Sequence, residues 1–247
     1  MKRLKERQKQ IDELRPGDKI CPHCSEIFSP IWDHFEKAWK YPDLTDDGIC
    51  RRCRRLIHIR ENIEDYLKKA GVPPKYLKCS FDNFRIKKEN NHPFKLCREY
   101  ATHPDCNLFL YGSYGTGKTH MAVAIARELL LQGKEVIFIS VPRLLFDIRK
   151  AFQEDAQTEA EYVERYTSLE YLILDDFGAE KTTDWARQTL YYIIYERDNY
   201  LKPTVITSNL SLDEIAEKLD GRISSRLAGM GKVIQFKGKD FRLRRIK

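Results

Sequence analysis

The chain has 247 residues, of which 42% are hydrophobic and 33% charged, a composition that suits a folded globular protein and excludes a disordered one. Lys and Arg exceed Asp and Glu by 44 to 37, and this modest net charge of +7 permits contact with nucleic acid or an acidic partner without establishing either. No apolar run approaches the roughly 20 residues that cross a bilayer, and the basic start lacks the apolar core of a secretory signal, so we expect a cytoplasmic protein.

The first third of the chain differs in pattern from the rest. Residues 1–19 are predicted to form a short charged helix that ends at Arg15-Pro16-Gly17, because proline and the residue before it disfavour helix. A second helix is predicted over Arg51–Lys69, and Gly71-Val72-Pro73-Pro74 then breaks the chain as a linker. We therefore expect an N-terminal module over residues 1–72 and a larger domain over residues 73–247.

Four cysteines of this module form two C-x₂-C pairs with twenty-five residues between them. They are Cys21, Cys24, Cys50 and Cys53. Two thiolates three residues apart bind one metal ion from a tight turn, and this spacing is typical of a structural zinc site. His23 and His34 are alternative ligands, and four free thiols or a redox pair are the other interpretations. A segment of about 50 residues has too little core to fold alone, and bound zinc, with an apparent binding energy on the order of 10–16 kcal/mol, would stabilise it.

Basic and aromatic side chains surround these cysteines. They are Arg51, Arg52, Arg54, Arg55, Trp32, Phe35, Trp39 and Tyr41. Such a mixture suits stacking on single-stranded DNA, and it equally suits docking to a protein, while some of the aromatic rings are needed for the module's own core. The three remaining cysteines, Cys79, Cys97 and Cys106, are expected to be small buried apolar residues.

Four short apolar runs in the second domain predict strands that are buried on both faces of a parallel sheet. They cover residues 108–111, 136–139, 171–174 and 204–207, and each is followed by a turn and then by helical spacing. The domain is therefore predicted to be α/β, with helices on both faces of the sheet.

The first predicted strand leads into a loop that matches G-x-x-x-x-G-K-[ST]. Its residues are Gly112, Ser113, Tyr114, Gly115, Thr116, Gly117, Lys118 and Thr119. In such a loop the backbone N–H groups and the start of the next helix face a phosphate chain, the lysine reaches the β- and γ-phosphates, and the threonine hydroxyl binds Mg²⁺. A strand before the loop and an amphipathic helix over residues 118–132 supply the context, so the sequence predicts a site for ATP and Mg²⁺.

Polar residues at the ends of two other strands complete this prediction. Asp175 follows the run 171–174 and is expected to hold Mg²⁺, and Asp176 is placed to orient or deprotonate the attacking water. Asn209 ends the next strand and can polarise that water. Each of these also has a simpler interpretation as a polar residue in an exposed turn.

Arginines near the end of the chain are candidates for contacts with the γ-phosphate. Arg222 and Arg226 are four residues apart and share one helix face, from which an arginine can reach the nucleotide of a neighbouring subunit; the alternative is a basic surface. Arg242 is a candidate for a second sensor of the γ-phosphate.

The block from Cys79 to Arg242 resembles the DnaC/DnaI-type helicase loaders and the related IstB-type transposition ATPases, which are AAA+ proteins. The resemblance rests on six pieces in order: CSFDNF (79–84), GSYGTGKTH (112–120), LILDDFG (172–178), ITSNLS (206–211), GRISSRL (221–227) and DFR (240–242). It implies that Lys118 and Thr119 contact the phosphates and Mg²⁺, and that Asp175 and Asp176 form the acidic pair. It further implies that Asn209, Arg226 and Arg242 are the sensor, the arginine finger and the second sensor.

The chain differs from other AAA+ proteins in two features, and each leads to an expectation. Asp176 stands where many of them have Glu, and the shorter carboxylate predicts slow ATP hydrolysis that serves as a switch. Only 21 residues follow Arg226, too few for a complete helical lid domain, which the loaders similarly lack.

The resemblance favours a loader that binds a hexameric replicative helicase through residues 1–70, self-associates through the AAA+ domain and contacts single-stranded DNA. In DnaI-like loaders a zinc-bearing N-terminal domain contacts the helicase. One alternative is an IstB-like accessory ATPase that binds duplex DNA and a transposase. Another is a zinc-dependent adaptor whose ATP site is only regulatory.

Overall fold

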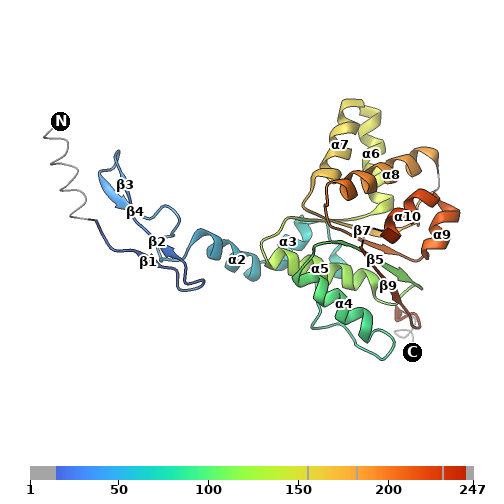
Figure 1. Ribbon diagram of the computed structural model, residues 1–247, viewed down its shortest axis with the longest axis horizontal. Coiled ribbons are helices and arrows are strands. Elements are labelled where there is room, and N and C mark those ends of the chain that lie inside the picture. The colour runs from blue at the N-terminus through green and yellow to red at the C-terminus, as the bar shows by residue number, and fades with distance from the viewer. Residues whose placement is uncertain (1–14, 155, 182, 230, 243–247) are drawn as a thin grey trace. The chain divides into compact units, whose positions relative to one another are not determined.

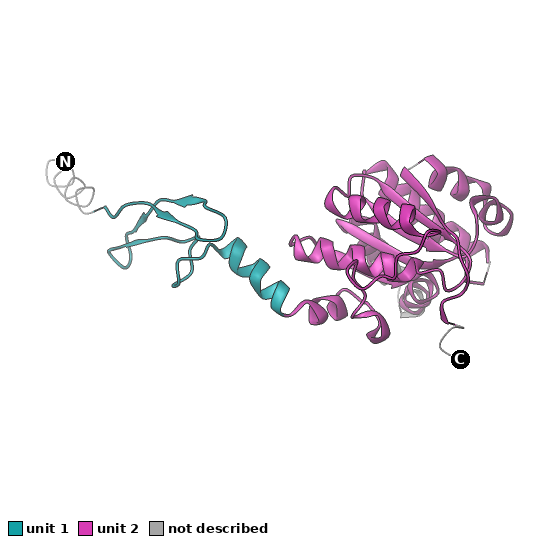
Figure 2. Ribbon diagram, turned by 90° about the horizontal axis from the view of Figure 1, so that it is seen from below, with its two compact units in different colours: residues 1–61 teal, residues 62–247 magenta. Residues whose placement is uncertain are grey.

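A computed structural model describes residues 15–154, 156–181, 183–229 and 231–242, and the chain divides into two compact units, residues 1–61 and 62–247 (Figure 2). The helix expected over residues 1–19 falls mainly on residues 1–14, which lie outside the described residues. Residues 15–18 form no helix, and the first strand begins at Lys19.

The first unit is built from two small hairpins and a helix. Strand β1 (Lys19–Ile20) pairs with β2 (Ile27–Phe28), and β3 (Ile31–Asp33) pairs with β4 (Ala38–Lys40), both antiparallel. Helix α2 (Arg51–Glu61) follows. The small core of the unit consists of cysteines with Phe28, Leu44 and Ile49 packed against them.

Two of the aromatic residues expected in the module's core pack on each other across the second hairpin. Trp32 and Trp39 are cross-strand partners with ring centroids 5.5 Å apart in an edge-to-face arrangement. Phe35, at the tip of the same hairpin, is 99% exposed. The packing of the two tryptophans therefore stabilises the hairpin, whereas the Phe35 ring is exposed to solvent.

The single helix expected over Arg51–Lys69 is divided in two. Helix α2 ends at Glu61, α3 spans Ile63–Lys69, and Asn62 between them has a non-helical backbone conformation. Residues 62–72 belong to the larger unit, whereas the sequence assigned them to the module. The reason is a backbone contact that the sequence does not reveal: the Phe138 N–H donates to the Ala70 carbonyl at 2.7 Å.

The second unit contains a five-stranded parallel sheet in the order β6-β7-β8-β5-β9. Figure 1 labels β7, β5 and β9 of this sheet. The strands are β5 (Asn107–Gly112), β6 (Val136–Ser140), β7 (Tyr171–Phe177), β8 (Thr204–Ser208) and β9 (Gly231–Phe236). The four apolar runs are all strands, as expected. Strand β9 was not predicted, because it lies at an edge of the sheet and mixes exposed with buried residues.

Helices cover both faces of this sheet, which confirms the predicted α/β class (Figure 1). They are η1 (Pro74–Tyr76), α4 (Asn91–Thr102), α5 (Lys118–Leu131), α6 (Val141–Glu154), α7 (Ala156–Ser168), α8 (Asp184–Asn199), α9 (Leu212–Lys218) and α10 (Gly221–Gly229). Helices α4 and α5 lie on one face and α6 to α10 on the other. Neighbouring residues of a strand point to opposite faces of the sheet. Phe109 and Leu172 point to the face covered by α6 and α8 and belong to the core on that face.

Local sequence explains where several of these helices begin. Ser211 and Glu214 form a capping box at the start of α9, and the Thr183 hydroxyl accepts from the Ala186 N–H at the start of α8. Within the described residues, no helix is long and apolar enough to cross a membrane.

Candidate nucleotide-binding site

The loop between β5 and α5 lies at the carboxyl edge of the parallel sheet, where ligands bind in such folds. Gly112 and Gly117 have φ angles of 134° and 101°, which residues with a side chain rarely adopt. A Cβ atom at Gly112 would stand 2.1 Å from the Phe236 carbonyl oxygen of β9, so the loop and the edge strand approach as closely as they do only because this residue is glycine. A cavity of about 900 Å³ opens beside the loop and is lined by residues 114–119.

Lys118 lies at the bottom of this site with only 6% of its surface exposed. Its ammonium group donates to the carbonyl oxygens of Gly112 and Ser113 at 2.7 and 2.9 Å, and to Oδ1 of Asn209 at 2.9 Å. Burial lowers the pKa of Lys118 to about 8, although Asp176 and Asp175 act in the opposite direction. Among the described residues, this buried cation has no directly bonded anion, which suits a site for phosphate.

The candidate magnesium ligands, Thr119 and Asp175, are joined by a hydrogen bond. The Thr119 hydroxyl donates to Oδ1 of Asp175 at 3.0 Å, and the Thr207 hydroxyl donates to the same oxygen at 2.6 Å. Asp175 is 5% exposed, and burial raises its pKa. A hydroxyl and a carboxylate at this distance form the all-oxygen donor set that Mg²⁺ prefers, so these residues fit that ion.

Asp176 follows in a strained conformation and faces the cavity. Its φ angle is 56°, in the left-handed region, and its N–H donates to the Thr207 hydroxyl at 3.1 Å. Asp176 and Asn209 both line the cavity with Lys118. Thr207 therefore orders both acidic residues; sequence reasoning missed it because only the pairing of β7 with β8 brings it there.

The segment after β9 also reaches the phosphate loop. The Phe241 N–H donates to the Gly115 carbonyl at 3.0 Å, and a Cβ atom at Gly115 would stand 1.7 Å from Oδ1 of Asp240. Arg242 lines the cavity, as does Phe84, whose ring edge would be 2.7 Å from a Cβ atom at Gly117. Phe84 and Asp240 stand in two of the pieces that carry the resemblance, CSFDNF and DFR, but the sequence assigned neither of them a role in the site.

The structure does not bring Arg226 into the site of its own chain. Arg226 lies on α10, pairs with Asp198 at 3.0 Å and stacks 4.4 Å from the centre of the Tyr195 ring. It is absent from the residues that line the cavity. Arg226 therefore lies outside the cavity that holds Lys118.

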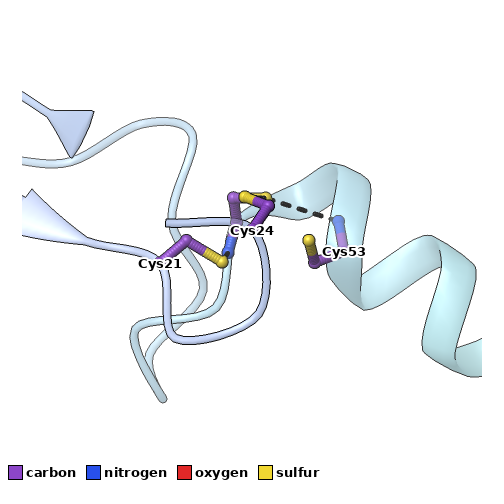
Figure 3. A group of neighbouring side chains, drawn as sticks. Cys21, Cys24 and Cys53 are labelled. Atoms are coloured by element: carbon purple, nitrogen blue, oxygen red, sulfur yellow. Dashed lines mark hydrogen bonds between the residues drawn. The ribbon is translucent and has the colours of Figure 1, made fainter. Parts of the chain in front are cut away.

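The first unit holds a separate candidate metal site. The Sγ atoms of four cysteines, Cys21, Cys24, Cys50 and Cys53, lie within 4.8 Å of one another. Figure 3 shows Cys21 and Cys24, from the turn between β1 and β2, facing Cys53 in the first turn of α2. His23 and His34 do not belong to this cluster.

The geometry of the cluster fits tetrahedral zinc. The Cys24 and Cys50 sulfurs are 3.7 Å apart, and a zinc–sulfur bond of about 2.3 Å gives a tetrahedron edge of about 3.8 Å. The Cys50 N–H donates to the Cys21 sulfur at 3.4 Å and lowers the pKa of Cys21 to about 6, while the hydrogen bond with Cys50 raises the pKa of Cys53 to about 12. Crowded thiolates oppose one another's ionisation, and a bound cation would relieve this conflict.

Comparisons with known proteins agree with this geometry. The family model of IstB-like ATP binding proteins matches residues 58–247. The replicative helicase loader DnaC of Escherichia coli strain K12 is 28% identical over 163 residues, which make up 64% of this chain and 66% of the loader, so the match covers slightly less than two thirds of that protein. The cysteine cluster precedes residue 58 and lies outside the family model.

Solved structures share the fold of the second unit. A crystal structure of the DnaC helicase loader superposes with a TM-score of 0.61 and 27% identity, and the match covers 67% of this chain and 100% of that chain. A crystal structure of DnaI superposes with a TM-score of 0.58 at 24% identity over 68% of this chain and 93% of that one, a likeness of fold.

Proposed function

This chain belongs to the family of IstB-like ATP-binding proteins, AAA+ proteins related to the DnaC and DnaI helicase loaders, and from that premise we propose that it loads a hexameric replicative helicase onto single-stranded DNA in an ATP-dependent step during replication initiation. The observation that carries the proposal is the convergence of Lys118, Asn209 and Asp176 on one cavity in a chain whose relatives include a replicative helicase loader.

ATP binding is the first part of the proposed activity. The N–H groups of residues 112–117 and the start of α5 would receive the phosphates, and the ammonium group of Lys118 would exchange its carbonyl partners for phosphate oxygens. Thr119 and Asp175 would hold Mg²⁺, which screens the phosphate charge. Arg242, at the rim of the same cavity, is proposed to contact the γ-phosphate.

Slow hydrolysis is the second part. Asp176 is an exposed carboxylate that lines the cavity, and it is proposed to orient or deprotonate the attacking water, with Asn209 polarising it. The short side chain of Asp reaches less far than that of Glu, so we expect a slow ATPase that works as a switch.

Self-association is the third part. Arg226 is proposed to complete the site of a neighbouring copy by stabilising charge in the transition state. Its position on α10, outside its own cavity, supports this assignment. Hydrolysis would then depend on assembly of the AAA+ domains.

The zinc module is proposed to contact the helicase. It precedes the segment matched by the family model, and it exposes Phe35 and the basic side chains of Arg51 and Arg52. Exposed aromatic rings and arginines are both frequent anchors of protein interfaces. The same features suit stacking on single-stranded DNA.

A transposition accessory ATPase is the second candidate, and the family match itself favours it. Light scattering of the chain mixed with its host's replicative helicase, with and without ATP, distinguishes the two. A stable complex containing one helicase hexamer supports the loader. Absence of that complex, with ATP-dependent assembly on duplex DNA, would replace the loader by the transposition ATPase.

A matched pair of variants makes this test specific. Lys118→Ala should remove the ATP-dependent part of the assembly, whereas Lys95→Ala, an exposed lysine on α4, should not. Full assembly of Lys118→Ala would favour an adaptor whose ATP site is only regulatory.

A further inference from the structure

The loop after β7 contains a buried acidic residue that no part of the proposed mechanism uses. Glu180 follows Asp175 and Asp176 in sequence and is only 6% exposed. Its Oε2 accepts from the Gly178 N–H at 2.9 Å, whereas its Oε1 is buried without a hydrogen-bond partner among the described residues. Burying a carboxyl group in this way costs free energy, so its presence requires an explanation.

Glu180 is one of two groups that hold Gly178. While Glu180 accepts from the Gly178 N–H, the ammonium group of Lys218 on α9 donates to the Gly178 carbonyl. Both backbone polar groups of this glycine are thus fixed by side chains of opposite charge. Gly178 has a φ angle of 85°, which places the sharp turn after β7 at this residue.

The position of Gly178 determines where Asp176 stands. The Ala179 N–H donates to the Asp176 carbonyl at 3.2 Å, which closes the turn around Phe177 and Gly178. Asp176 itself has a left-handed backbone, a conformation that persists only when its surroundings fix it. Asp176 and Ala179 both line the nucleotide cavity, so a shift of the turn moves the carboxylate relative to the nucleotide.

The same turn is attached to the segment that carries Asn209. The Ser208 hydroxyl donates to the Phe177 carbonyl at 2.7 Å and accepts from the Leu210 N–H at 3.0 Å. A Cβ atom at Gly178 would stand 2.7 Å from Cδ1 of Leu210, so the two segments touch at this point. Any displacement of Gly178 therefore changes the spacing between Asp176 and Asn209.

We propose that Glu180 is a positioning residue for ATP hydrolysis: through Gly178 it fixes the turn after β7 and thereby the spacing of Asp176 and Asn209 around the attacking water. This inference rests on the proposed function, because it requires that the chain hydrolyses ATP. It concerns the rate of the chemical step and not the affinity for ATP, since Glu180 does not line the cavity.

The test compares Glu180→Ala, Glu180→Gln and Lys218→Met with the full-length wild-type chain in single-turnover ATP hydrolysis and in ATP-binding titrations. Gln keeps an oxygen that accepts from the Gly178 N–H, whereas Ala and Met each remove one of the two anchors of Gly178. Glu217→Ala, an exposed acidic residue on α9, is the matched control. Lys118→Ala provides the background rate.

We expect Glu180→Ala to lower the hydrolysis rate at least about tenfold with the Kd for ATP within about twofold of wild type, and Lys218→Met to show the same separation of rate from affinity. Glu180→Gln should recover to within about threefold of the wild-type rate. Because Lys218→Met leaves Glu180 in place, it tests the anchor even where Glu180→Ala does not fold.

Two outcomes would overturn the inference, and a third separates it from the proposed function. A wild-type rate in both Glu180→Ala and Lys218→Met would show that the anchors do not position the site. A purely structural role would be shown if Glu180→Ala lost hydrolysis rate and affinity for ATP together with a lower Tm, and if Glu180→Gln did not recover the rate. Wild-type protein no faster than Lys118→Ala would refute ATP hydrolysis itself and this inference with it.

Discussion

The ammonium group of Lys118 donates a hydrogen bond to the side-chain oxygen of Asn209 at 2.9 Å and so joins the phosphate loop after β5 to the end of β8. The two residues are 91 positions apart in sequence. They meet because β5 and β8 are neighbours in the parallel sheet, with Tyr111 aligned with Ser208. Under the proposed function, this contact would let both residues respond to the same bound phosphate.

Removal of Lys118 should weaken ATP binding more than removal of Asn209. Lys118→Ala loses a charge-assisted contact worth about 1.5–3 kcal/mol, so the Kd for ATP should rise about 10- to 150-fold. Asn209→Ala should leave the Kd within about threefold and lower the hydrolysis rate at least about tenfold, because its role is to polarise water. Calorimetric titration and single-turnover hydrolysis measure both quantities. Equal losses of affinity in the two variants would contradict these separate roles.

ATP affinity should fall above about pH 8. Burial lowers the pKa of Lys118 to about 8 in the free protein, from an ordinary value of 10.5. Phosphate oxygens beside the ammonium group would raise this pKa, so binding is fully favoured below pH 8 and requires uptake of a proton above it. The Kd should be about tenfold higher at pH 9 than at pH 7.

Lys118→Ala provides the control for this pH dependence, because it removes the titrating group. Its Kd, although higher, should change less than about twofold between pH 7 and pH 9. The same tenfold change in Lys118→Ala would assign the effect to another residue.

The central strands were predictable because each is a continuous apolar run buried on both faces, as in Leu108, Leu110 and Ile173, which are fully buried. Strand β9 was not, because Lys232 and Val233 are exposed on an edge. The two- and three-residue strands of the first unit were also not predicted. The core of that unit consists mainly of cysteines, so its short strands show no periodic pattern of apolar residues. The order of strands in the sheet depends on tertiary packing that no local pattern encodes.

The sequence predicted those site residues whose own side chains are expected to contact the ligand. It did not predict residues that are expected to act through another residue. Lys118 stands in a motif whose spacing reflects the shape of a phosphate chain, and Asp175 stands at the carboxyl end of a buried strand, where ligands bind in such sheets. Thr207 and Glu180 act on backbone or carboxyl groups that only the folded chain brings near. Their residue types are common in turns and strands, so nothing in their sequence context distinguishes them.

Zinc removal should unfold the first unit and leave ATP binding intact. The cluster of four cysteines forms the core of that unit, so loss of the metal removes its main source of stability. Cys50→Ser should lower the zinc content from about one ion per chain to near zero. Elemental analysis and the fluorescence of Trp32 and Trp39, read in a Trp185→Phe background, check this expectation.

Cys79→Ser is the matched control for the zinc prediction, because Cys79 lies outside the cluster and belongs to the second unit. It should keep the zinc and the tryptophan signal. Loss of ATP binding together with zinc in Cys50→Ser would contradict the expectation that the two units are stable independently of each other.

Arg226 should act on a neighbouring copy, because in its own chain it is engaged with Asp198 and Tyr195 and does not line the cavity. Arg226→Ala should bind ATP with a Kd within about twofold of wild type and hydrolyse it at least about 100-fold more slowly, since an arginine finger contributes about 10³- to 10⁵-fold to hydrolysis in related chemistry. Arg222→Ala, one helical turn away and paired with Asp220, should keep the wild-type rate.

Mixing two inactive variants distinguishes action in trans from action in cis. Lys118→Ala retains Arg226 but cannot bind ATP well, and Arg226→Ala retains the nucleotide site but lacks the finger. In a mixed assembly some sites of the second variant face an intact Arg226 of the first, so hydrolysis should reappear on mixing and increase with the proportion of Lys118→Ala until it is in excess. Because neither variant can restore the other within a single chain, recovery requires a contact between copies. A mixture no more active than its separate components, in assemblies shown by light scattering to contain both variants, would refute the assignment of Arg226.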